Sequence, residues 1–554
     1  MNNRLTLDYG MRFVHQQPQY ETSGLASNFL PEEYARGAAP QLYVAGCANG
    51  VYPCSGTNRQ AMNPVNGQFL GPGSTIAIGA IVPNTGNSTN GIFVAGQGIT
   101  KTAFEWPLIG LAPRFGMAYD LTGQQNLVIR GGAGLFFDRP SGNSVFAQVL
   151  NPPTLQNVTV RYGQLQTLGG GLTTQTPPAL NVFEYESNLP ASIQWNSGVQ
   201  MALPWAMALD VSYVGQRQSV ILQNMDINRV DFGTAFLTEN QDRTLAASTT
   251  PGATAVVSDL MRTFRGYSSI TQTSGWQERT YHSLQLSLQR RFRNGLSFGF
   301  NDTIGLYDRQ NTTPRLQHAP DGTVSIRSDQ AEADRLLGDN NPQAHIIKAN
   351  FVWDLPDVRG SSSLVKTIGV IANDWQLAGI WTAATGSAYA IGYSYNNGGG
   401  NVNLTGSPDY GGRIRIVGDT GSGCSDDVYR QFDAAAFQGP LTGSVGLESG
   451  NNYLKGCFQS ALDLSLQRTI NLGGGRAIQL RADVFNAFNE ARITGRNTTI
   501  SFVNPSDPVT ATNLPYDANG NLVASRSLPR GAGFGVANAY QTPRQVQLQI
   551  RFRF

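Results

Sequence analysis

The last ten residues of the chain, 545–554, alternate between polar and apolar side chains. Every second residue from Val546 to Phe554 is large and apolar, and the residues between them are glutamine or arginine. Successive side chains of a β-strand point to opposite faces, so the segment predicts a strand with one apolar and one polar face. Because a tilted strand of about 9–11 residues crosses a bilayer, the length fits a membrane-spanning strand.

The same alternation, at similar length, recurs along the whole chain. Between residues 292 and 296 it is interrupted by Arg293, Asn294 and Gly295, an Asn-Gly hairpin signal. The pattern predicts an all-β fold, an antiparallel transmembrane β-barrel with twelve strands in this chain. The predicted strands are residues 4–14, 112–120, 127–138, 192–203, 206–215, 282–292, 296–304, 345–355, 375–384, 461–470, 477–486 and 545–554.

The connections between these segments alternate in length. Five are short, although residues 356–374 form a longer turn with an apolar patch from Leu364 to Ile371. The other six run from roughly forty to a hundred residues, and this asymmetry is that of short periplasmic turns and long extracellular loops. If the first strand runs outward, the twelfth runs inward and leaves Phe554 at the periplasmic rim.

Aromatic side chains recur near the ends of the predicted strands. In a membrane barrel such residues form interfacial belts, whereas in a soluble fold they are ordinary packing residues. A soluble propeller or sandwich stays open as an alternative, but its strands are usually shorter and its connections less regular. The residues in question are Trp205, Phe292, Trp353, Trp375 and Phe552.

Composition narrows these alternatives without deciding between them. The chain has 554 residues, 63 of them glycine, and only 14% are charged. No run of 18 apolar residues is present, so the sequence predicts no transmembrane helix. A net charge of +2 argues against a nucleic-acid partner.

No catalytic or cofactor motif rises above background, and we expect neither an enzyme nor a cofactor. The four histidines, His15, His282, His318 and His345, lack metal-ligand spacing and are expected in loops or on the lumen wall. Residues 419–422, Asp-Thr-Gly-Ser, match an aspartic-protease string that needs a second copy. The glycine-rich residues 131–134 lie within a predicted strand rather than a nucleotide-binding loop.

Two sets of charged or polar residues have a possible binding role. The acidic residues Asp329, Glu332, Asp334 and Asp339 offer carboxylates to a hard cation, but such a run is more often a solvated loop or short helix. A set on the predicted lumen side could line a transport path or hold a plug inside the barrel, although simple packing along a wet wall is the safer interpretation. Its members are Arg130, Gln285, Arg291, Gln479 and Arg481.

Four cysteines fall in the long loops. Cys47 and Cys54 lie in the first loop, and Cys424 and Cys457 lie in the fifth. An even number of loop cysteines fits two disulfides in an oxidising compartment. Sequence alone does not supply the geometry that pairing requires.

Several short motifs resemble, in order, the barrel of Oar-like TonB-dependent receptors. They spread over essentially the whole chain, so the match rests on their succession rather than on any one of them. The motifs are PRFG at residues 113–116, IRGGAGLFFDRP at 129–140, QWN at 194–196, YHSLQ at 281–285, RRF at 290–292, DWQLAGI at 374–380, TG at 385–386, ADVFNAFN at 482–489 and the C-terminal strand.

The resemblance implies a receptor in the outer membrane of a Gram-negative bacterium that imports a scarce, unidentified ligand. It implies that outer-membrane lipid surrounds the barrel and that the TonB complex drives uptake through an N-terminal plug. A terminal aromatic such as Phe554 resembles the signal read by the barrel-assembly machinery. The ligand itself stays open among carbohydrate, peptide and iron chelate.

The sequence departs from this family at its beginning. Residues 1–12 show strand alternation rather than a signal peptide, and no plug or TonB box is present. The barrels of such transporters have 22 strands. We therefore interpret residues 1–554 as the C-terminal part of such a barrel, without its plug. The alternatives are a passive porin-like or small closed barrel and, from another class, a surface adhesin.

Overall fold

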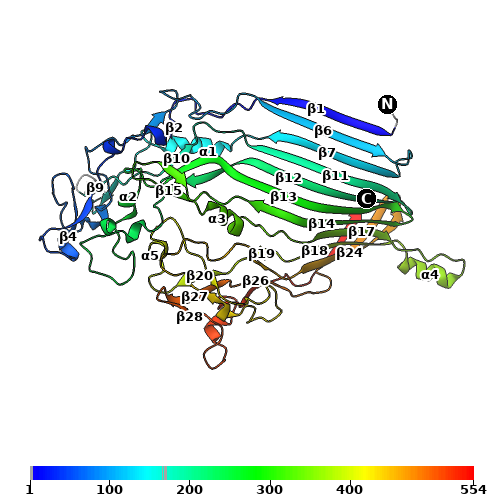
Figure 1. Ribbon diagram of the computed structural model, residues 1–554. Coiled ribbons are helices and arrows are strands. Elements are labelled where there is room, and N and C mark those ends of the chain that lie inside the picture. Colours follow the sequence, from blue (N-terminus) through cyan, green and yellow to red (C-terminus); the bar gives the residue numbers. More distant parts are fainter. Residues whose placement is uncertain (1–3, 165, 167–170) are drawn as a thin grey trace.

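The computed structural model describes residues 4–164, 166 and 171–554. Its main body is one curved antiparallel sheet whose twelve long strands follow one another in sequence order (Figure 1). These strands are β1 (Leu5–Val14), β6 (Gly110–Asp120), β7 (Leu127–Phe137), β11 (Ala191–Leu203), β12 (Met207–Asp226), β13 (Ile270–Arg293), β14 (Leu296–Gln310), β17 (Ile346–Asp354), β18 (Trp375–Ala384), β24 (Gln459–Gly473), β25 (Arg476–Phe485) and β30 (Gln545–Arg553). Each predicted segment coincides with one of them.

Three central strands are longer than the sequence pattern indicates. β12, β13 and β14 have 20, 24 and 15 residues, more than a bilayer crossing needs. A thirteenth strand, β10 (Leu180–Phe183), pairs in parallel with the start of β13. The extra length therefore carries the middle of the sheet up into the long loops.

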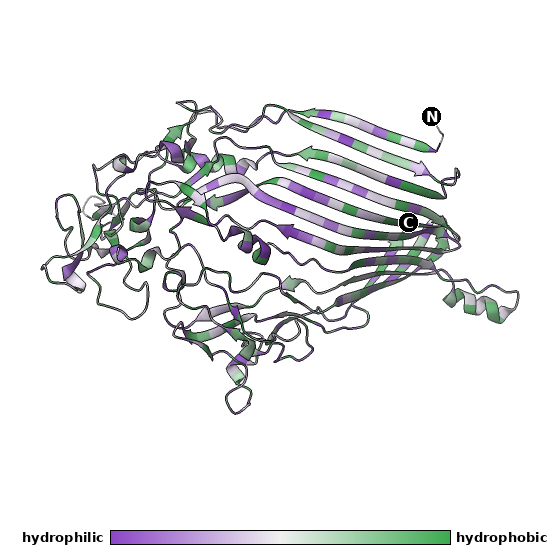
Figure 2. Cartoon of the chain, viewed as in Figure 1, coloured by the Kyte–Doolittle hydropathy of each residue, from purple (hydrophilic) through white to green (hydrophobic). Residues whose placement is uncertain are grey.

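The strand register gives the sheet one apolar and one polar face. On the apolar face Leu480 of β25 lies opposite Ile550 of β30, whereas Arg481 lies opposite Gln549 on the polar face. Neighbouring strands likewise place apolar residues opposite apolar ones and polar residues opposite polar ones. Figure 2 shows this alternation as bands of hydrophobic and hydrophilic residues along the strands. Isoleucine and leucine on the outer strand β30 remain about two-thirds or more exposed. The apolar face therefore has no protein layer over it at β30.

The sheet is open in the part of the chain that the structure describes. There β1 pairs with β6 alone, and β30 pairs with β25 alone. The closed twelve-stranded barrel considered above is therefore not formed by these strands. Both edges keep a row of backbone hydrogen-bonding groups for further partners.

Short turns gather at one end of the sheet, the short-turn rim, and long loops at the other, the long-loop rim (Figure 1). The predicted hairpin between β13 and β14 is confirmed, with Asn294 at φ 52° and Gly295 at φ 74°. The longest turn at the short-turn rim joins β17 to β18. Its apolar patch forms the helix α4 (Ser363–Ala372).

The six long loops contain short elements of their own. The helices are α1 (Gly142–Phe146), α2 (Ser258–Met261), α3 (Gln330–Leu337) and α5 (Asn401–Thr405). The short strands are β2 (Ser27–Phe29), β3 (Val44–Cys47), β4 (Arg59–Met62), β5 (Ile92–Val94), β8 (Thr159–Arg161), β9 (Leu172–Thr174), β15 (Leu316–His318), β16 (Val324–Ile326), β19 (Ala388–Tyr389), β20 (Gly392–Tyr395), β21 (Arg415–Ile416), β22 (Phe437–Gln438), β23 (Leu454–Lys455), β26 (Ile493–Arg496), β27 (Thr499–Asn504), β28 (Asp507–Ala511) and β29 (Ala537–Tyr540). They make small sheets outside the main one.

Two buried clusters hold the loops together. Four different long loops contribute to loop core 1, which consists of Phe29, Leu180, Val182, Ile227, Phe264, Tyr267, Ile270 and Leu316. The last two loops form loop core 2, which consists of Ile391, Ile414, Ala436, Phe437, Leu454, Ile500, Phe502 and Phe534. All six long loops thus contribute residues to one of the two cores.

Polar contacts tie the two cores to each other. Arg262 of the third loop bonds the Asp409 carboxylate of the fifth at 3.0 Å. Tyr410 accepts a hydrogen bond from the Leu316 amide at 3.0 Å, and Arg315 donates to the Val445 carbonyl at 2.6 Å. The long loops therefore form one ordered layer, the loop layer, over the long-loop rim. None of the described helices has the length and apolar character needed to cross a membrane.

Candidate ligand-binding site

The polar face of the sheet carries linked polar side chains. Gln467 donates to Gln376 at 2.6 Å and accepts from Gln479 at 3.2 Å, which joins β18, β24 and β25. Arg481 donates to Asp483 at 2.8 Å on the same face. The five residues predicted to line a lumen also lie on the polar face. For example, Gly198 lies opposite both Arg130 and Ser212 on its two neighbouring strands, and Ser212 lies opposite Gln285, so Arg130 and Gln285 point to the same side. The face is a polar wall whose side chains can hydrogen-bond to polar ligands.

A cavity of about 440 Å³ lies where this polar face meets the loop layer, at the ends of β7, β11 and β12. Gln216 donates to the Ser192 hydroxyl at 3.0 Å across its floor. Phe136 adds an aromatic ring, over which the Arg114 guanidinium lies at 4.6 Å. We call this the wall cavity; its lining is Phe136, Phe137, Asp138, Arg139, Pro140, Ser141, Pro190, Ala191, Ser192, Gln194, Gln216, Gln218, Val220, Ile221 and Leu222.

The glycine-rich segment 131–134 lies within β7, as predicted, next to the wall cavity. Gly132 and Gly134 lie on the polar face opposite Asn196 and Gln194. A Cβ at Gly132 would come within 3.2 Å of the Phe115 carbonyl. The glycines thus keep the wall thin and free of side chains there.

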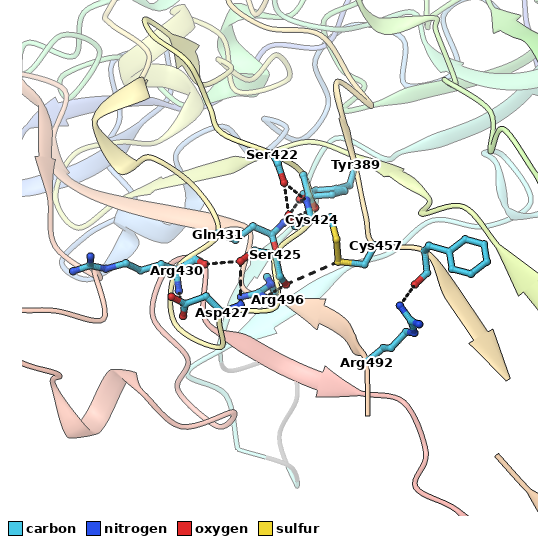
Figure 3. The surroundings of a disulfide bond; sticks show 12 residues. Tyr389, Ser422, Cys424, Ser425, Asp427, Arg430, Gln431, Cys457, Arg492 and Arg496 are labelled. Atoms are coloured by element: carbon cyan, nitrogen blue, oxygen red, sulfur yellow. Dashed lines mark hydrogen bonds between the residues drawn. A yellow bond between two sulfur atoms is a disulfide. The ribbon is translucent and has the colours of Figure 1, made fainter. Parts of the chain in front are cut away.

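A second cavity, of about 270 Å³, lies inside the loop layer beside Cys424 and Cys457 (Figure 3). Tyr389 donates to the Gly423 carbonyl at 2.7 Å and accepts from the Gln431 amide at 2.5 Å. Burial raises the pKa of Tyr389 to about 12, so its hydroxyl stays protonated as a donor. We call this the loop cavity.

Arg496 supplies the positive charge of the loop cavity. Its guanidinium donates to the Gly535 carbonyl at 2.8 Å and to the Ser425 carbonyl at 2.7 Å. Burial lowers the pKa of Arg496 below its usual value, and Asp427 opposes that shift. The arginine therefore serves mainly to join the fifth loop to the sixth.

The structure joins the cysteines in the two pairs that the sequence suggested. Cys47 and Cys54 have Cα atoms 5.9 Å apart, and Cys424 and Cys457 have Cα atoms 4.7 Å apart. Both separations are ordinary for disulfides. The second bond closes a stretch that contains Phe437 and Leu454 of loop core 2. It therefore constrains the wall of the loop cavity.

The histidines do not form a metal site, but one of them is not where we expected it. His15, His318 and His345 lie outside the main strands or at their ends, and the described residues hold no metal-binding cluster. The expectation of a loop or lumen position is wrong for His282. This histidine lies two residues before Leu284 in β13, so its side chain points to the same, apolar face.

His282 sits there in an aromatic group near the long-loop rim. Its Nδ1 is 2.7 Å from the Tyr213 hydroxyl, and its ring centroid is 5.7 Å from that of Trp195. Gly215 makes room for this group, because a Cβ there would overlap the Trp195 ring at 2.3 Å. Aromatic side chains that carry a polar atom, as tyrosine, tryptophan and histidine do, are suited to a membrane interface.

The acidic run is a short helix with arginine partners rather than a cation site. Asp329 precedes α3 and accepts hydrogen bonds from Arg315 at 3.0 Å and from Arg327 at 2.9 Å. Partial burial opposes ionisation, yet these two arginines lower the pKa of Asp329 to about 2. Glu332 pairs with Arg335 at 2.7 Å. Asp329 and Glu332 are thus already paired with arginines, whereas Asp334 accepts hydrogen bonds from Thr312 and Gln330.

The protease-like string at residues 419–422 is a local turn. The Asp419 carboxylate accepts a hydrogen bond from the Gly421 amide at 2.9 Å. Such a contact is the usual role of aspartate in a turn. It offers no paired carboxylate for catalysis.

The predicted aromatic belt and the C-terminal residue lie at the short-turn rim. Trp205 is in the turn after β11, and Trp375 is the first residue of β18. Phe292, Trp353 and Phe552 are each the second-last residue of their strands. Phe554 follows β30 and is fully exposed. The positions are those of an interfacial belt.

The sequence did not reveal the loop cores or either cavity. They depend on contacts between residues far apart in the sequence, such as Phe29 with Phe264 at 5.2 Å between ring centroids in loop core 1. No periodic pattern marks such contacts in advance. Only the buried aromatic residues scattered through the loops hint at them.

Several solved structures are similar to part of the chain. The chain is structurally similar to the ferric enterobactin receptor of Pseudomonas aeruginosa, with 12% identity and a TM-score of 0.35 over 79% of this chain and 39% of that one. It is similar to the siderophore receptor PiuA of Acinetobacter baumannii, with 8% identity and a TM-score of 0.31 over 73% and 34%. It is also similar to the outer membrane transporter YddB of Escherichia coli, with 10% identity and a TM-score of 0.34 over 73% of this chain and 39% of that one.

The chain spans less than half the length of these three structures. No curated protein matches it. A family model described as an outer membrane beta barrel domain matches residues 1–547, which is nearly the whole chain. The chain therefore belongs to the outer membrane beta barrel domain family, and its location is the outer membrane of a Gram-negative bacterium.

Proposed function

We propose that the chain is the barrel wall of a receptor of the Oar-like, TonB-dependent type that actively imports a scarce ligand. One observation carries this function: a polar wall whose cavity opens directly beneath an ordered layer of loops. A cavity of about 440 Å³ lined by glutamines and a phenylalanine suits a small polar ligand. Catalysis has no comparable support, because the Ser192 hydroxyl in the lining bonds Gln216 and Gln194 rather than a general base.

We further propose that residues 1–554 form the C-terminal part of a larger barrel. The support is the open sheet, whose edges β1 and β30 each have a single partner strand in the described chain. In hydrocarbon an unpaired strand edge is costly, so further strands would have to close it. A barrel of 22 strands, with a plug that engages the TonB complex, has the size for this.

Uptake by cells tests this function. Cells that produce the intact gene product are given labelled carbohydrate, peptide or iron-chelate ligands, with and without a protonophore. The proposal expects saturable uptake of one class that the protonophore abolishes. Uptake that rises linearly with concentration and ignores the protonophore would indicate a porin. Binding at the cell surface without uptake would indicate an adhesin.

Variants of the wall cavity then locate the ligand. Gln216→Ala removes a donor from the cavity floor, whereas Gln479→Ala removes a similar amide lower on the same polar face. Loss of one hydrogen bond to the ligand costs about 0.5–1.5 kcal/mol, so the KM for uptake rises about two- to tenfold for Gln216→Ala. The Gln479→Ala variant keeps its KM. Equal effects of the two changes would argue against the cavity.

A further inference from the structure

The helix α4 carries an apolar stripe that no part of the described chain covers. Leu364, Ile368 and Ile371 follow the spacing i, i+4, i+7, so they lie on one face of the helix. Their side chains are 71%, 46% and 70% exposed. A neighbouring side of the helix packs on its own turn, where Val365 lies beside Gly360. The stripe is thus turned away from the protein.

The start of α4 is built as a stable helix end. Ser362 caps it by accepting a hydrogen bond from the Val365 amide at 3.3 Å. Asn373 closes the turn at the other end, where its side chain accepts from the Val358 amide at 2.7 Å. The apolar stripe is therefore presented by an ordered helix rather than by a loose turn.

The end of α4 is held on the apolar side of the sheet. Trp375 and Arg468 lie opposite each other at the short-turn rim and share the parity of Leu377 and Leu466. The Trp375 indole donates to the Ile371 carbonyl at 2.8 Å. Arg468 donates to the Asn373 carbonyl at 3.0 Å and also to the Val370 carbonyl. Both anchors thus reach α4 from the face that meets lipid.

The helix therefore continues the membrane surface of the barrel at its rim. It projects beyond the ends of β17 and β18 (Figure 1) and is largely apolar (Figure 2). Trp353 and Trp375 of the aromatic belt are on the two strands that it joins. An amphipathic helix at that level meets phospholipid headgroups and the first part of their chains.

We propose that α4 is an interfacial membrane helix, which lies in the periplasmic leaflet of the outer membrane and binds phospholipid through Leu364, Ile368 and Ile371. The inference rests on the outer-membrane location of the chain and not on the uptake function. It adds a lipid-binding element to a turn that otherwise only connects two strands. Through Trp375 and Arg468 the helix would fix the depth of the rim in the bilayer.

Site-specific fluorescence tests the proposal. Single-cysteine variants Leu364→Cys and Ile371→Cys are labelled with bimane, and Ser363→Cys, which is exposed away from the stripe, is the matched control. The native cysteines are all in disulfides, so no native thiol competes for the label. The protein is folded into vesicles of phosphatidylethanolamine and phosphatidylglycerol, with heat-modifiable gel mobility as the check on folding.

The proposal expects blue-shifted bimane emission at positions 364 and 371 and quenching by phospholipid doxyl-labelled near the headgroup. At position 363 emission stays near that in water, and iodide in solution quenches it. If iodide quenches all three labels alike, the stripe does not meet lipid and the proposal is overturned in favour of a periplasmic protein partner. Ile371→Asp, combined with Leu364→Cys, should restore iodide quenching at position 364.

Discussion

Removal of the Cys424–Cys457 disulfide should loosen loop core 2 while the strands of the sheet stay folded. The bond links residues 33 positions apart, and the stretch between them supplies Phe437, Ala436 and Leu454 to that core. Chain-entropy arguments give a cross-link of this span about 3.7 kcal/mol of stabilisation, measured against the opened loop. The corresponding value for Cys47–Cys54, seven positions apart, is about 2.4 kcal/mol.

Native-state hydrogen exchange measures these two values locally. In the Cys424→Ser, Cys457→Ser double variant, amides of β20 and β27 should exchange up to about 500-fold faster, which is the rate equivalent of 3.7 kcal/mol. Amides of β24 and β25 should keep their protection. The matched control, Cys47→Ser with Cys54→Ser, should accelerate exchange only around β3 and β4. Unchanged exchange in β20 and β27 would refute the idea that this bond holds loop core 2 closed.

Three further predictions concern the loop layer and the C-terminus. Phe437 is 1% exposed in loop core 2, so Phe437→Ala should lower the free energy of local opening there by about 3–5 kcal/mol. Phe488 is exposed, and Phe488→Ala should change that free energy by less than about 0.5 kcal/mol. Hydrogen exchange measures both changes. His318 is buried, which opposes its charged form, but hydrogen bonds to Asp231 and to the Ile227 carbonyl raise its pKa overall. The stabilising effect of the protonated ring is therefore full below about pH 6.5 and is lost as pH rises through the raised pKa. Amides of β15 should then exchange faster at alkaline pH than the intrinsic exchange rate alone explains. Asp231→Asn should abolish this additional pH dependence. Phe554→Ala should reduce the fraction of assembled protein in cells, measured by heat-modifiable mobility, without affecting folding into vesicles; equal loss in both would contradict an assembly signal.

The main sheet could be predicted from the sequence because its physical cause is local. Alternation with a period of two is present in each strand separately, so 375–384 was predicted with the ends that β18 has. The extra length of β13 escaped prediction because residues 270–281 do not alternate between apolar and polar side chains. Their pairing with β12 and β10 is instead set by long-range contacts.

The candidate site could be predicted only in part. The parity of Arg481 and Gln479 placed them on the polar face, since they share a strand with a clear pattern. The wall cavity, however, combines side chains from β7, β11 and β12, and nothing in one segment shows how three strands meet. Asp329 illustrates the same limit, because its partner Arg315 is 14 residues away and decides between an ion pair and a cation ligand.

Spin labels placed one by one along β25 test the central claim most directly. The account holds that Ile478, Leu480, Ala482 and Val484 face lipid while Gln479, Arg481 and Asp483 face water. With the protein in phospholipid vesicles, collision with oxygen should peak at the first set and collision with a water-soluble nickel complex at the second. Two profiles that alternate out of phase are the predicted result. Labels at the first set that neither reagent reaches, with nickel reaching only the second, would place the apolar face against a second protein layer and contradict the account.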